Sequence, residues 1–362
     1  MNDLTWMKLA ADEAIRAMPY QTFENPRVGA VIVKDGQVIV TGCHEKFGEA
    51  HAEINAFNRV KNKTDILGAT LYVTLEPCST QGKVGSCAVQ IQNWGLKRVV
   101  VGSIDPNPST NGKGIKILRL AGIIVDVLNT VENKEINPAF HYFYTTRLPY
   151  VQLKLAMSQN GSVAEKFGKR KKLTDELADT DVHRERATRS AIMIGSETMI
   201  TDQPMLTVRH INISHKQPLR VVIDRRGRLQ NTNFDFSNNW LIYTENVLFS
   251  KQHSYVKLMS GALKDILIDL AKQNIQSVMV EGGPSLIHSF LKENLWQEML
   301  IYTTDKVLSK DSLKGISVSQ KPKNEVQVGN AVKKSISIIK GESNNVYRYY
   351  TRGWSFNKHL SA

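Results

Sequence analysis

Cysteine is scarce in this sequence, which has three cysteines among 362 residues. So few thiols cannot form the disulfide framework of a small secreted domain, and they are typical of a reducing compartment. No stretch approaches the roughly 18 uninterrupted apolar residues that a membrane span needs. The first six residues lack the basic start and the apolar run of a signal peptide. These absences predict a cytoplasmic protein that has no membrane partner.

Internal repeats and long low-complexity segments are absent as well. Because the chain is too long for one ordinary core, we expect two domains, residues 1–147 and 148–362. The first carries 16 basic and 14 acidic residues, whereas the second carries 31 and 20. A basic domain attracts nucleic acid, membrane phosphates or small phosphorylated ligands, and charge alone does not distinguish them.

Strand-like and helical patterns alternate through both halves, which predicts an α/β layer fold. The dipeptide Asp35-Gly36 between two apolar runs predicts a hairpin. In the first half we expect helices over 4–18, 51–60, 86–94 and 114–121, and strands over 28–33, 37–40, 69–74, 98–102 and 123–127. In the second half we expect strands over 150–157, 190–195, 220–224, 240–243, 277–281 and 299–302, and helices over 175–189, 262–273 and 285–294.

The most informative pattern is His51-Ala52-Glu53, followed by Pro77-Cys78 and by Cys87. One histidine and two cysteines can hold Zn²⁺ and leave a fourth position for water, as in catalytic zinc sites. The order H-x-E and then P-C is that of zinc-dependent base deaminases, although their cysteines are spaced C-x2-C and these are C-x8-C. Glu53 is then expected to carry a proton from water to a ring nitrogen and to departing ammonia. The substrate is therefore an amino-substituted aromatic nitrogen ring.

Three neighbouring side chains have less specific interpretations. Glu76 either supports the zinc ligands from outside or is an ordinary carboxylate at a strand end. Cys43 ends an apolar run and is expected to be a buried small side chain rather than a ligand. His44 is the nearest spare ligand, but it lies in a loop before His51.

Further motifs follow one another in order along the chain. They are Asn25 to Gly29, Gly42 to Glu53, Val73 to Ser79, Asp105 to Pro108, Tyr150 to Ser158, Thr201 to Arg209 and Val280 to Leu286. Together they resemble the bifunctional pyrimidine deaminase–reductase family of riboflavin biosynthesis, in which the C-x8-C spacing also occurs. The resemblance covers nearly the whole chain.

This resemblance implies a cytidine-deaminase-like three-layer α/β/α domain followed by a dihydrofolate-reductase-like α/β domain. It implies zinc-dependent deamination of a diaminopyrimidinone bearing a ribosylamino 5′-phosphate, and then NADPH-dependent reduction of the ribosyl group to ribityl. The expected cofactors are zinc and NADPH. The expected partners are this small phosphorylated pyrimidine and further copies of the chain, not nucleic acid.

The same resemblance implies roles for individual residues. The zinc ligands are His51, Cys78 and Cys87, and the catalytic proton carrier is Glu53. The substrate-binding residues are Asn25, His44, Lys83, Asp105, Asn107, Arg186, Arg209 and Glu281. The cofactor-binding residues are Ala156, Lys172, Thr198, Asp202, Gly283, Pro284 and Ser285.

Elementary chemistry supports some of these roles in the second domain. Gly282-Gly283 at a strand end lets backbone N–H groups approach a phosphate beside a helix N-terminus. The guanidinium groups of Arg186 and Arg209 suit a 5′-phosphate, which they can bind bidentately. Without the resemblance, an ordinary Gly-Gly turn and two surface arginines would be the simpler interpretations.

The chain departs from the family pattern mainly in the second domain. Lys172 stands where the family usually has an aromatic residue near the cofactor, and Gln203 replaces a second aspartate. In the first domain a Pro-Pro pair is missing before Cys87, although the basic residue Lys83 is kept. An active deaminase with a degenerate reductase domain is therefore a competing hypothesis.

Two more hypotheses come from different classes of protein. A nucleic-acid base deaminase would also need zinc, His-Ala-Glu and a basic surface, but the C-x8-C spacing and the nearly neutral first domain disfavour it. A non-catalytic, zinc-stabilised module could bind RNA through the basic half. That module would not need Glu53, and its binding would fall steeply with salt.

Overall fold

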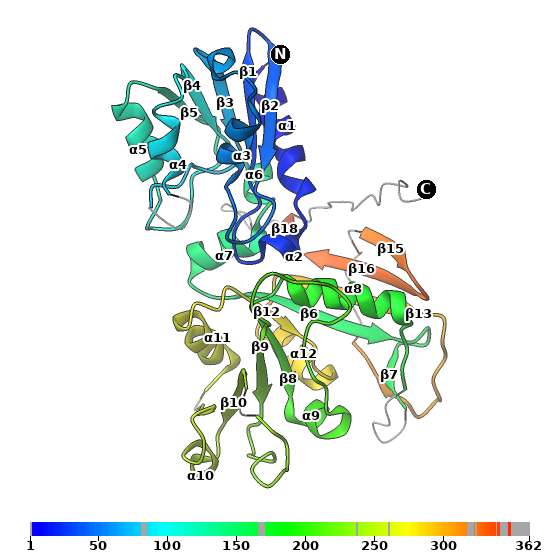
Figure 1. Cartoon of the computed structure of the whole chain (residues 1–362). Coiled ribbons are helices and arrows are strands. Elements are labelled where there is room, and N and C mark those ends of the chain that lie inside the picture. Colours follow the sequence, from blue (N-terminus) through cyan, green and yellow to red (C-terminus); the bar gives the residue numbers. More distant parts are fainter. Residues whose placement is uncertain are drawn as a thin grey trace. The chain divides into compact units, whose positions relative to one another are not determined.

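The computed structural model describes residues 2–80, 85–165, 171–236, 238–259, 261–316, 322, 324–337, 339–340 and 347–348. The chain forms two compact units (Figure 1). The first consists of Met1–Pro149 with Asn212–Lys216, and the second of Tyr150–Ile211 with Gln217–Ala362. Among the described residues, no helix has the length and the apolar character that crossing a membrane requires.

The first unit is built on a five-stranded sheet in the order β2-β1-β3-β4-β5. Strands β3, β4 and β5 are parallel, and β1 is antiparallel to both of its neighbours. The strands are β1 (Gly29–Lys34), β2 (Gln37–Cys43), β3 (Thr70–Val73), β4 (Arg98–Val101) and β5 (Ile124–Val127). The helices are α1 (Asp3–Arg16), α2 (Pro19–Thr22), α3 (Ala52–Arg59), α4 (Cys87–Ile91), α5 (Lys113–Leu120), α6 (Val131–Lys134) and α7 (Pro138–Thr146), with a 3₁₀ turn at Lys63–Ile66.

Apolar side chains cover both faces of this sheet, because successive residues of a strand point to opposite sides. Val31 and Val33 of β1 pack with Met7 of α1 on one face. Ala30 and Ile32, which alternate with them, pack into the larger core formed with α3, α4 and α5. The unit is therefore the three-layer α/β/α sandwich that was predicted.

The second unit is built on a nine-stranded sheet in the order β11-β10-β9-β8-β12-β6-β13-β16-β15. Neighbours from β11 to β13 are parallel, and β16 and β15 complete the sheet as an antiparallel pair. The strands are β6 (Tyr150–Met157), β8 (Ala191–Gly195), β9 (Leu219–Ile223), β10 (Trp240–Thr244), β11 (Val256–Leu258), β12 (Ser277–Val280), β13 (Glu298–Thr304), β15 (Asn324–Val328) and β16 (Ala331–Ser337). Shorter strands pair separately: β7 (Ser162–Ala164) with β14 (Leu313–Lys314), and β17 (Ile339–Lys340) with β18 (Tyr347–Arg348).

Helices cover both faces of the parallel part of this sheet. They are α8 (Glu176–Ala187), α9 (Ser196–Asp202), α10 (Val247–Ser250), α11 (Leu263–Lys272) and α12 (Pro284–Lys292). Val182 of α8 and Met199 of α9 share one core with Ile192, Val222 and Met279 of the sheet. The connections through α11 and α12 run back along the sheet, so right-handed crossovers place these helices on the opposite face.

Most of the predicted elements are confirmed to within a few residues, and β6 has the predicted bounds. The predicted hairpin forms at Asp35-Gly36, where both residues have positive φ, 50° and 76°. The predictions missed several elements, among them α7, the β15–β16 hairpin and α9. Helix α9 matters most for function, because it contains Thr198 and Asp202.

Candidate active sites

The three predicted zinc ligands come together in the first unit. His51 is the N-cap residue of α3, Cys78 follows the end of β3, and Cys87 is the first residue of α4. The side chain of His51 does not cap its own helix, so its ring can turn toward the two sulfur atoms. As a result, the three ligand atoms all lie within 4.8 Å of one another.

The geometry and the chemistry of this donor set fit zinc. Nδ1 of His51 lies 3.2 Å from Sγ of Cys87 and 3.5 Å from Sγ of Cys78. A tetrahedral zinc ion with ordinary Zn–N and Zn–S bonds would separate such atoms by about 3.5 Å. The neighbouring thiol of Cys87 and the imidazole of His51 lower the pKa of Cys78 to about 4. This lowering favours the thiolate form of Cys78, which is the form that binds metals.

Glu53 lies beside the sulfur atoms, in the first turn of α3. Its side chain is 3% exposed and is within hydrogen-bond reach of Cys87. Burial raises the pKa of its carboxyl group. A carboxyl group with a raised pKa can take up and return a proton near neutral pH, which is the task of a general acid–base catalyst.

Asn25 and His44, two predicted substrate residues, contact each other next to His51. Nδ2 of Asn25 lies 3.4 Å from Nε2 of His44, and the rings of His44 and His51 meet edge to face at 5.4 Å. Nδ1 of His44 lies 3.0 Å from the carbonyl oxygen of Ala50. A carbonyl only accepts, so Nδ1 carries the proton and Nε2 accepts from Asn25. Burial lowers the pKa of His44, so this wall of the site is neutral.

Glu76 anchors the loop that follows β4. Its Oε2 accepts hydrogen bonds from the backbone N–H groups of Asp105 (3.2 Å) and Gly112 (2.9 Å). Its Oε1 accepts from those of Gly114 (3.0 Å) and Ile115 (3.3 Å). Four bonds on one buried carboxylate show that Glu76 is not an ordinary strand-end residue.

The anchored loop carries the predicted substrate residues Asp105 and Asn107. Oδ1 of Asp105 accepts from the N–H of Asn107 at 2.8 Å, and burial raises the pKa of Asp105 to about 6. The start of α5 is pressed against the turn that precedes Cys78, since a Cβ on Gly114 would lie 1.9 Å from the carbonyl oxygen of Pro77. Glu76 thus connects the zinc-ligand turn to the loop.

Glu76→Gln is expected to weaken substrate binding more than zinc binding. The glutamine amide can accept with one oxygen only, so two buried N–H groups lose their acceptor at about 1–3 kcal/mol each. We expect a higher KM for deamination, a smaller fall in kcat and an unchanged zinc content. Glu49→Gln, at an exposed carboxylate nearby, is the matched control. Loss of zinc with an unchanged KM would instead mean that Glu76 acts on the metal ligands.

In the second unit, Arg186 of α8 and Glu281 after β12 form a buried ion pair. Nη2 of Arg186 donates to Oε2 of Glu281 at 3.0 Å, and Nε donates to Oε1. Nζ of Lys154, in β6, lies 3.7 Å from the same carboxylate. Burial opposes ionisation of Glu281, but the two cations overcome it and lower its pKa to about 2. Lys154 was not predicted as a site residue, although a lysine inside a largely apolar parallel strand was a signal.

Arg209 is connected to this ion pair by hydrogen bonds to Thr207 and His183. Its backbone N–H donates to Nδ1 of His183 at 3.0 Å, and its Nη1 donates to Oγ1 of Thr207 at 3.0 Å. Arg186 also reaches Thr207, at the carbonyl oxygen, so its guanidinium is engaged by Glu281 and Thr207 together. The predicted phosphate contact therefore fits the exposed Arg209 better than Arg186, whose side chain is only 12% exposed.

His183 makes the stability of this unit depend on pH. Burial, together with the charges of Arg186 and Arg209, lowers the pKa of His183 to about 4. The unfolded chain binds a proton at this histidine below about pH 6.5, whereas the folded chain does not until about pH 4. The contribution of His183 to the free energy of unfolding is therefore fully present above pH 6.5. It is lost as the pH falls from 6.5 toward 4.

Between pH 7 and pH 5, the free energy of unfolding of the wild-type protein is expected to fall by about 1–2 kcal/mol more than that of His183→Gln. Glutamine keeps an acceptor for the N–H of Arg209 but does not titrate. The measurement is urea unfolding of both proteins at the two pH values. Equal losses in the two proteins would show that His183 is not the group responsible.

The predicted cofactor residues gather at the carboxyl ends of β6, β8 and β12. Ala156 lies in β6, Thr198 lies in α9 after β8, and Gly283 caps α12, which begins with Pro284 and Ser285. Among the described residues, a Cβ on Gly283 would have within 4 Å only Oγ1 of Thr198, at 3.8 Å. An open backbone at a helix N-terminus fits the diphosphate of NADPH.

The remaining predicted residues lie differently. Nζ of Lys172 is 2.7 Å from Oδ2 of Asp179, so its ammonium group is engaged by α8, and its predicted contact with the cofactor gains no support. Asp202 is the last residue of α9, which Gln203 ends in a left-handed conformation with φ 45°. Lys83 lies outside the described residues.

Comparison with known proteins finds relatives of both units. Residues 1–103 match the cytidine and deoxycytidylate deaminase zinc-binding region, and residues 149–328 match the RibD C-terminal domain. The riboflavin biosynthesis protein RibD of Buchnera aphidicola is 37% identical over 331 residues, which are 85% of this chain and 88% of that protein. The protein of the same name from Escherichia coli is 34% identical over 339 residues, 86% of this chain and 90% of that one.

Solved structures are similar over both units as well. Acinetobacter baumannii RibD in form 1 has a TM-score of 0.79 at 33% identity, covering 93% of this chain and 98% of that one. The diaminohydroxyphosphoribosylaminopyrimidine deaminase/5-amino-6-(5-phosphoribosylamino)uracil reductase of Thermotoga maritima has a TM-score of 0.75 at 33% identity. The match covers 92% of this chain and 97% of the Thermotoga chain.

Proposed function

Since the chain belongs to the family of the bifunctional riboflavin biosynthesis protein RibD, we propose which of its residues carry the deaminase and the reductase reactions. The proposed substrate of the first unit is the diaminopyrimidinone that bears a ribosylamino 5′-phosphate. The proposed substrate of the second unit is the deaminated product. The observation that carries this proposal is the convergence of His51, Cys78 and Cys87 beside Glu53.

In the first unit, His51, Cys78 and Cys87 hold zinc, which supplies Lewis-acid activation of water. Glu53 accepts a proton from the attacking water and delivers it to the ring nitrogen. Glu53 then takes the second proton, from the hydroxyl now bound to the ring carbon, and gives it to the amino group. The C–N bond breaks, the carbonyl forms and ammonia leaves. Asn25 and His44 bind the ring beside the ligands.

The loop anchored by Glu76 has a separate role in this unit. It presents Asp105 and Asn107 to the substrate. Two backbone bonds from the loop and two from the start of α5 reach Glu76 and fix the loop relative to the turn that carries Cys78. Glu76 is therefore a positioning residue. It binds neither the metal nor the substrate directly.

In the second unit, Thr198 and Gly283 line the position of NADPH, which supplies a hydride when bound. Arg209 binds the 5′-phosphate of the substrate, because its guanidinium is exposed and phosphate is bound bidentately by arginine. Glu281, held between Arg186 and Lys154, orients the sugar hydroxyl groups. The ribosyl group is reduced to ribityl between these two sets of residues.

The cellular setting is also part of the proposal. We place the protein in the cytoplasm, where its cysteines remain reduced, and we expect it to form a homo-oligomer. Within each chain we place the boundary between the two catalytic domains at residues 147 and 148. A small phosphorylated pyrimidine, and not nucleic acid, is the partner of the basic second half.

The experiment that tests the proposal is mass spectrometry of the products that zinc-loaded protein forms from this substrate with NADPH. A product both deaminated and reduced to ribityl supports both units. Deaminated product with NADPH unconsumed would leave the reductase assignment without support. Unchanged substrate from folded, zinc-loaded protein would overturn the proposed substrate.

A further inference from the structure

A short segment from the second half of the sequence lies in the first unit. The segment Asn212–Lys216 follows Arg209 along the chain, but it is part of the compact unit that contains the zinc ligands. The ring of His215 stacks on the ring of Phe23, with centroids 4.0 Å apart and an angle of 6° between the planes. Nε2 of His215 also lies 3.0 Å from the carbonyl oxygen of Tyr20. The segment therefore packs on α2 and on the turn that follows it.

We propose that His215 is a positioning residue of the deaminase: its ring holds Phe23 in a strained conformation and thereby holds Asn25 at the zinc site. The inference rests on the proposed function of the first unit, in which Asn25 binds the pyrimidine ring. It assigns a role in deamination to a residue far along the sequence from the zinc motifs. His215 acts through Phe23 and does not bind the substrate itself.

The backbone of Phe23 needs this support. Its φ of 55° and ψ of −120° are those of the first central residue of a type II′ turn. The N–H of Asn25 closes the turn by donating to the carbonyl oxygen of Thr22 at 3.0 Å. Glycine is favoured at this position, because a Cβ atom makes a positive φ costly. A phenylalanine keeps such a conformation only where its surroundings hold it.

Two aromatic contacts hold the ring of Phe23. It is stacked on His215, and it meets Phe47 edge to face with centroids 6.1 Å apart. Phe47 lies in the loop after β2, three residues beyond His44, and its N–H donates to the carbonyl oxygen of Gln21 at 2.9 Å. Aromatic pairs of this kind stabilise beyond the area that they bury. The turn at Phe23 is thus joined to the loop that carries His44.

The ring of His215 is itself held at both nitrogen atoms. Nδ1 lies 2.8 Å from the carbonyl oxygen of Lys216, and Nε2 faces that of Tyr20. A carbonyl oxygen only accepts, so a neutral ring donates one of these hydrogen bonds and a protonated ring donates both. Alanine at this position would lose the stacked ring together with these bonds.

The turn at Phe23 fixes the position of Asn25, two residues further along the chain. Nδ2 of Asn25 lies 3.4 Å from Nε2 of His44, at the wall of the site next to His51. A relaxed turn would draw the Asn25 amide away from this wall. His51 is placed by α3 instead, so the same change should leave the zinc ligands together. Loss of His215 is therefore expected to weaken substrate binding and to spare the metal.

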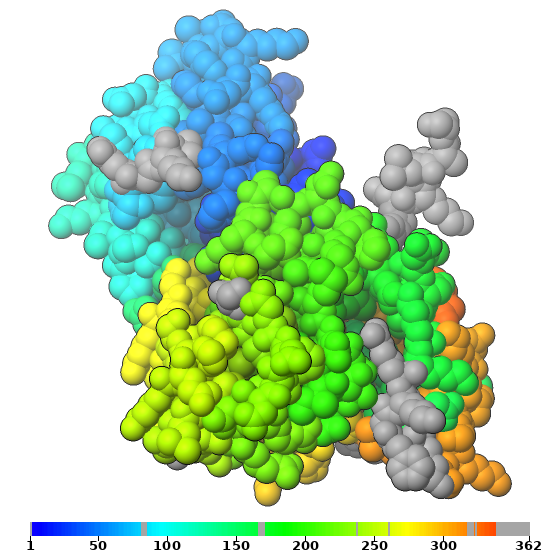
Figure 2. All heavy atoms as spheres, turned by 60° about the horizontal axis from the view of Figure 1, so that its bottom comes forward, coloured from blue at the N-terminus to red at the C-terminus, as the bar shows by residue number. Residues whose placement is uncertain are grey.

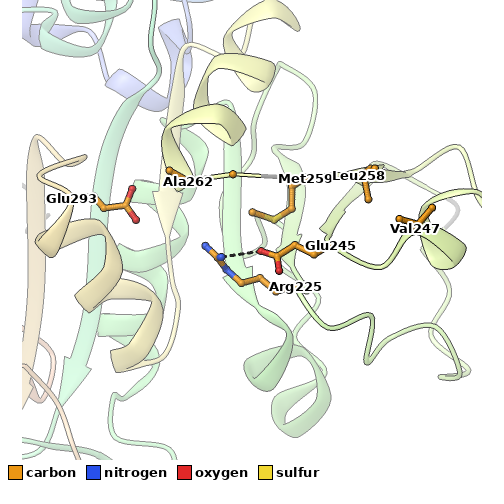
Figure 3. Close-up of a pocket in the computed structure, with 8 residues that line it drawn as sticks. Arg225, Glu245, Val247, Leu258, Met259, Ala262 and Glu293 are labelled. Carbon is orange, nitrogen blue, oxygen red and sulfur yellow. Dashed lines mark hydrogen bonds and ion pairs between the residues drawn. The ribbon is translucent and has the colours of Figure 1, made fainter.

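The reductase reaction should not depend on His215. A groove of about 630 Å³ opens at the carboxyl ends of β9, β10 and β11, and its lining residues all belong to the second unit (Figure 3). In Figure 2, this end of the second unit is turned toward the viewer, and the yellow-green loops lie at the surface. The contacts of His215 described above involve neither these residues nor the proposed reductase residues. Reduction of supplied deaminated substrate is thus an internal control.

The test is the KM for deamination of the diaminopyrimidinone ribosylamino phosphate, measured through ammonia release by zinc-loaded full-length protein. His215→Ala is expected to raise KM by about 5- to 20-fold, with kcat within about twofold of the wild-type value and an unchanged zinc content. His253→Ala is the matched control, because His253 is an exposed histidine that stacks on Tyr255 in the second unit.

A double variant tests whether strain at Phe23 is the cause. Glycine adopts the turn conformation without support, so Phe23→Gly combined with His215→Ala should have a lower KM than His215→Ala alone. Two losses of ordinary packing would instead add, and KM would rise further. A double variant whose KM is no lower than that of His215→Ala would overturn the inference.

The remaining outcomes separate this inference from the function on which it rests. Equal KM values for His215→Ala and wild-type protein would overturn the inference alone. Loss of zinc from His215→Ala would also overturn it, because the defect would then lie in the metal site. Wild-type protein that releases no ammonia from this substrate would overturn the proposed deaminase function, and the inference with it.

Discussion

Glu53→Gln is expected to lower the rate of deamination by on the order of a thousandfold or more. Glutamine keeps the size and the shape of the side chain at a residue that is 3% exposed, so the fold has no reason to change. It cannot accept the proton of water or return one to the amino group. Because Glu53 is not a ligand, the zinc content should stay at the wild-type value, and NADPH-dependent reduction of supplied deaminated substrate should be unaffected.

Ammonia release and zinc content are measured on the same preparations. Glu45→Gln is the control, since this carboxylate is exposed and forms its ion pair with Arg59. Ammonia released at the wild-type rate by zinc-loaded Glu53→Gln would contradict the proposed mechanism. Loss of zinc from this variant would show that Glu53 also holds the metal site together.

Glu281→Leu is expected to destabilise the second unit by about 3–5 kcal/mol. The substitution leaves the buried guanidinium of Arg186 without its carboxylate partner and removes the counter-charge from Lys154, 3.7 Å away. A buried charge without a partner costs far more than the loss of an exposed ion pair. The first unit does not contain this pair, so deaminase activity should persist at denaturant concentrations that abolish NADPH binding.

Urea unfolding, followed through ammonia release for the first unit and through NADPH binding for the second, measures this difference. Glu325→Leu is the matched control, because its pair with Lys334 is exposed and should contribute at most about 1 kcal/mol. The double variant Arg186→Leu with Glu281→Leu should recover part of the loss, since an ion pair can be replaced by packed apolar side chains. A loss no larger for Glu281→Leu than for Glu325→Leu would contradict the argument.

The sequence predicted the parts of the sites that depend on local structure. The proposed zinc ligands could be picked out because each stands at the end of a local element. His51 and Glu53 lie at one helix start, Cys78 follows a strand, and Cys87 opens a helix. The two-domain architecture, the family and the pairing of deamination with reduction were predicted from ordered motifs and are confirmed by the comparisons. Neither the nucleic-acid deaminase nor the RNA-binding module fits that family.

The sequence could not predict contacts between distant segments. Glu76 binds N–H groups spread from Asp105 to Ile115, and no spacing in the sequence marks such partners. Lys154 meets Glu281 across 127 positions of the sequence because β6 and β12 are neighbours. Helix α9 was missed because it is seven residues long and buries only one apolar side chain, Met199.

The place of β6 in the sheet has a consequence for synthesis on the ribosome. This strand is the first of the second unit to be made, but its two neighbours, β12 and β13, are made only after β8, β9, β10 and β11. At about 5–20 residues per second, β6 waits roughly 6–24 seconds for β12 to be translated. The five strands of the first unit are complete by Val127 and can already be paired. The nascent chain therefore carries the completed sheet of the first unit, followed by a largely apolar strand without partners, a segment for a chaperone to shield.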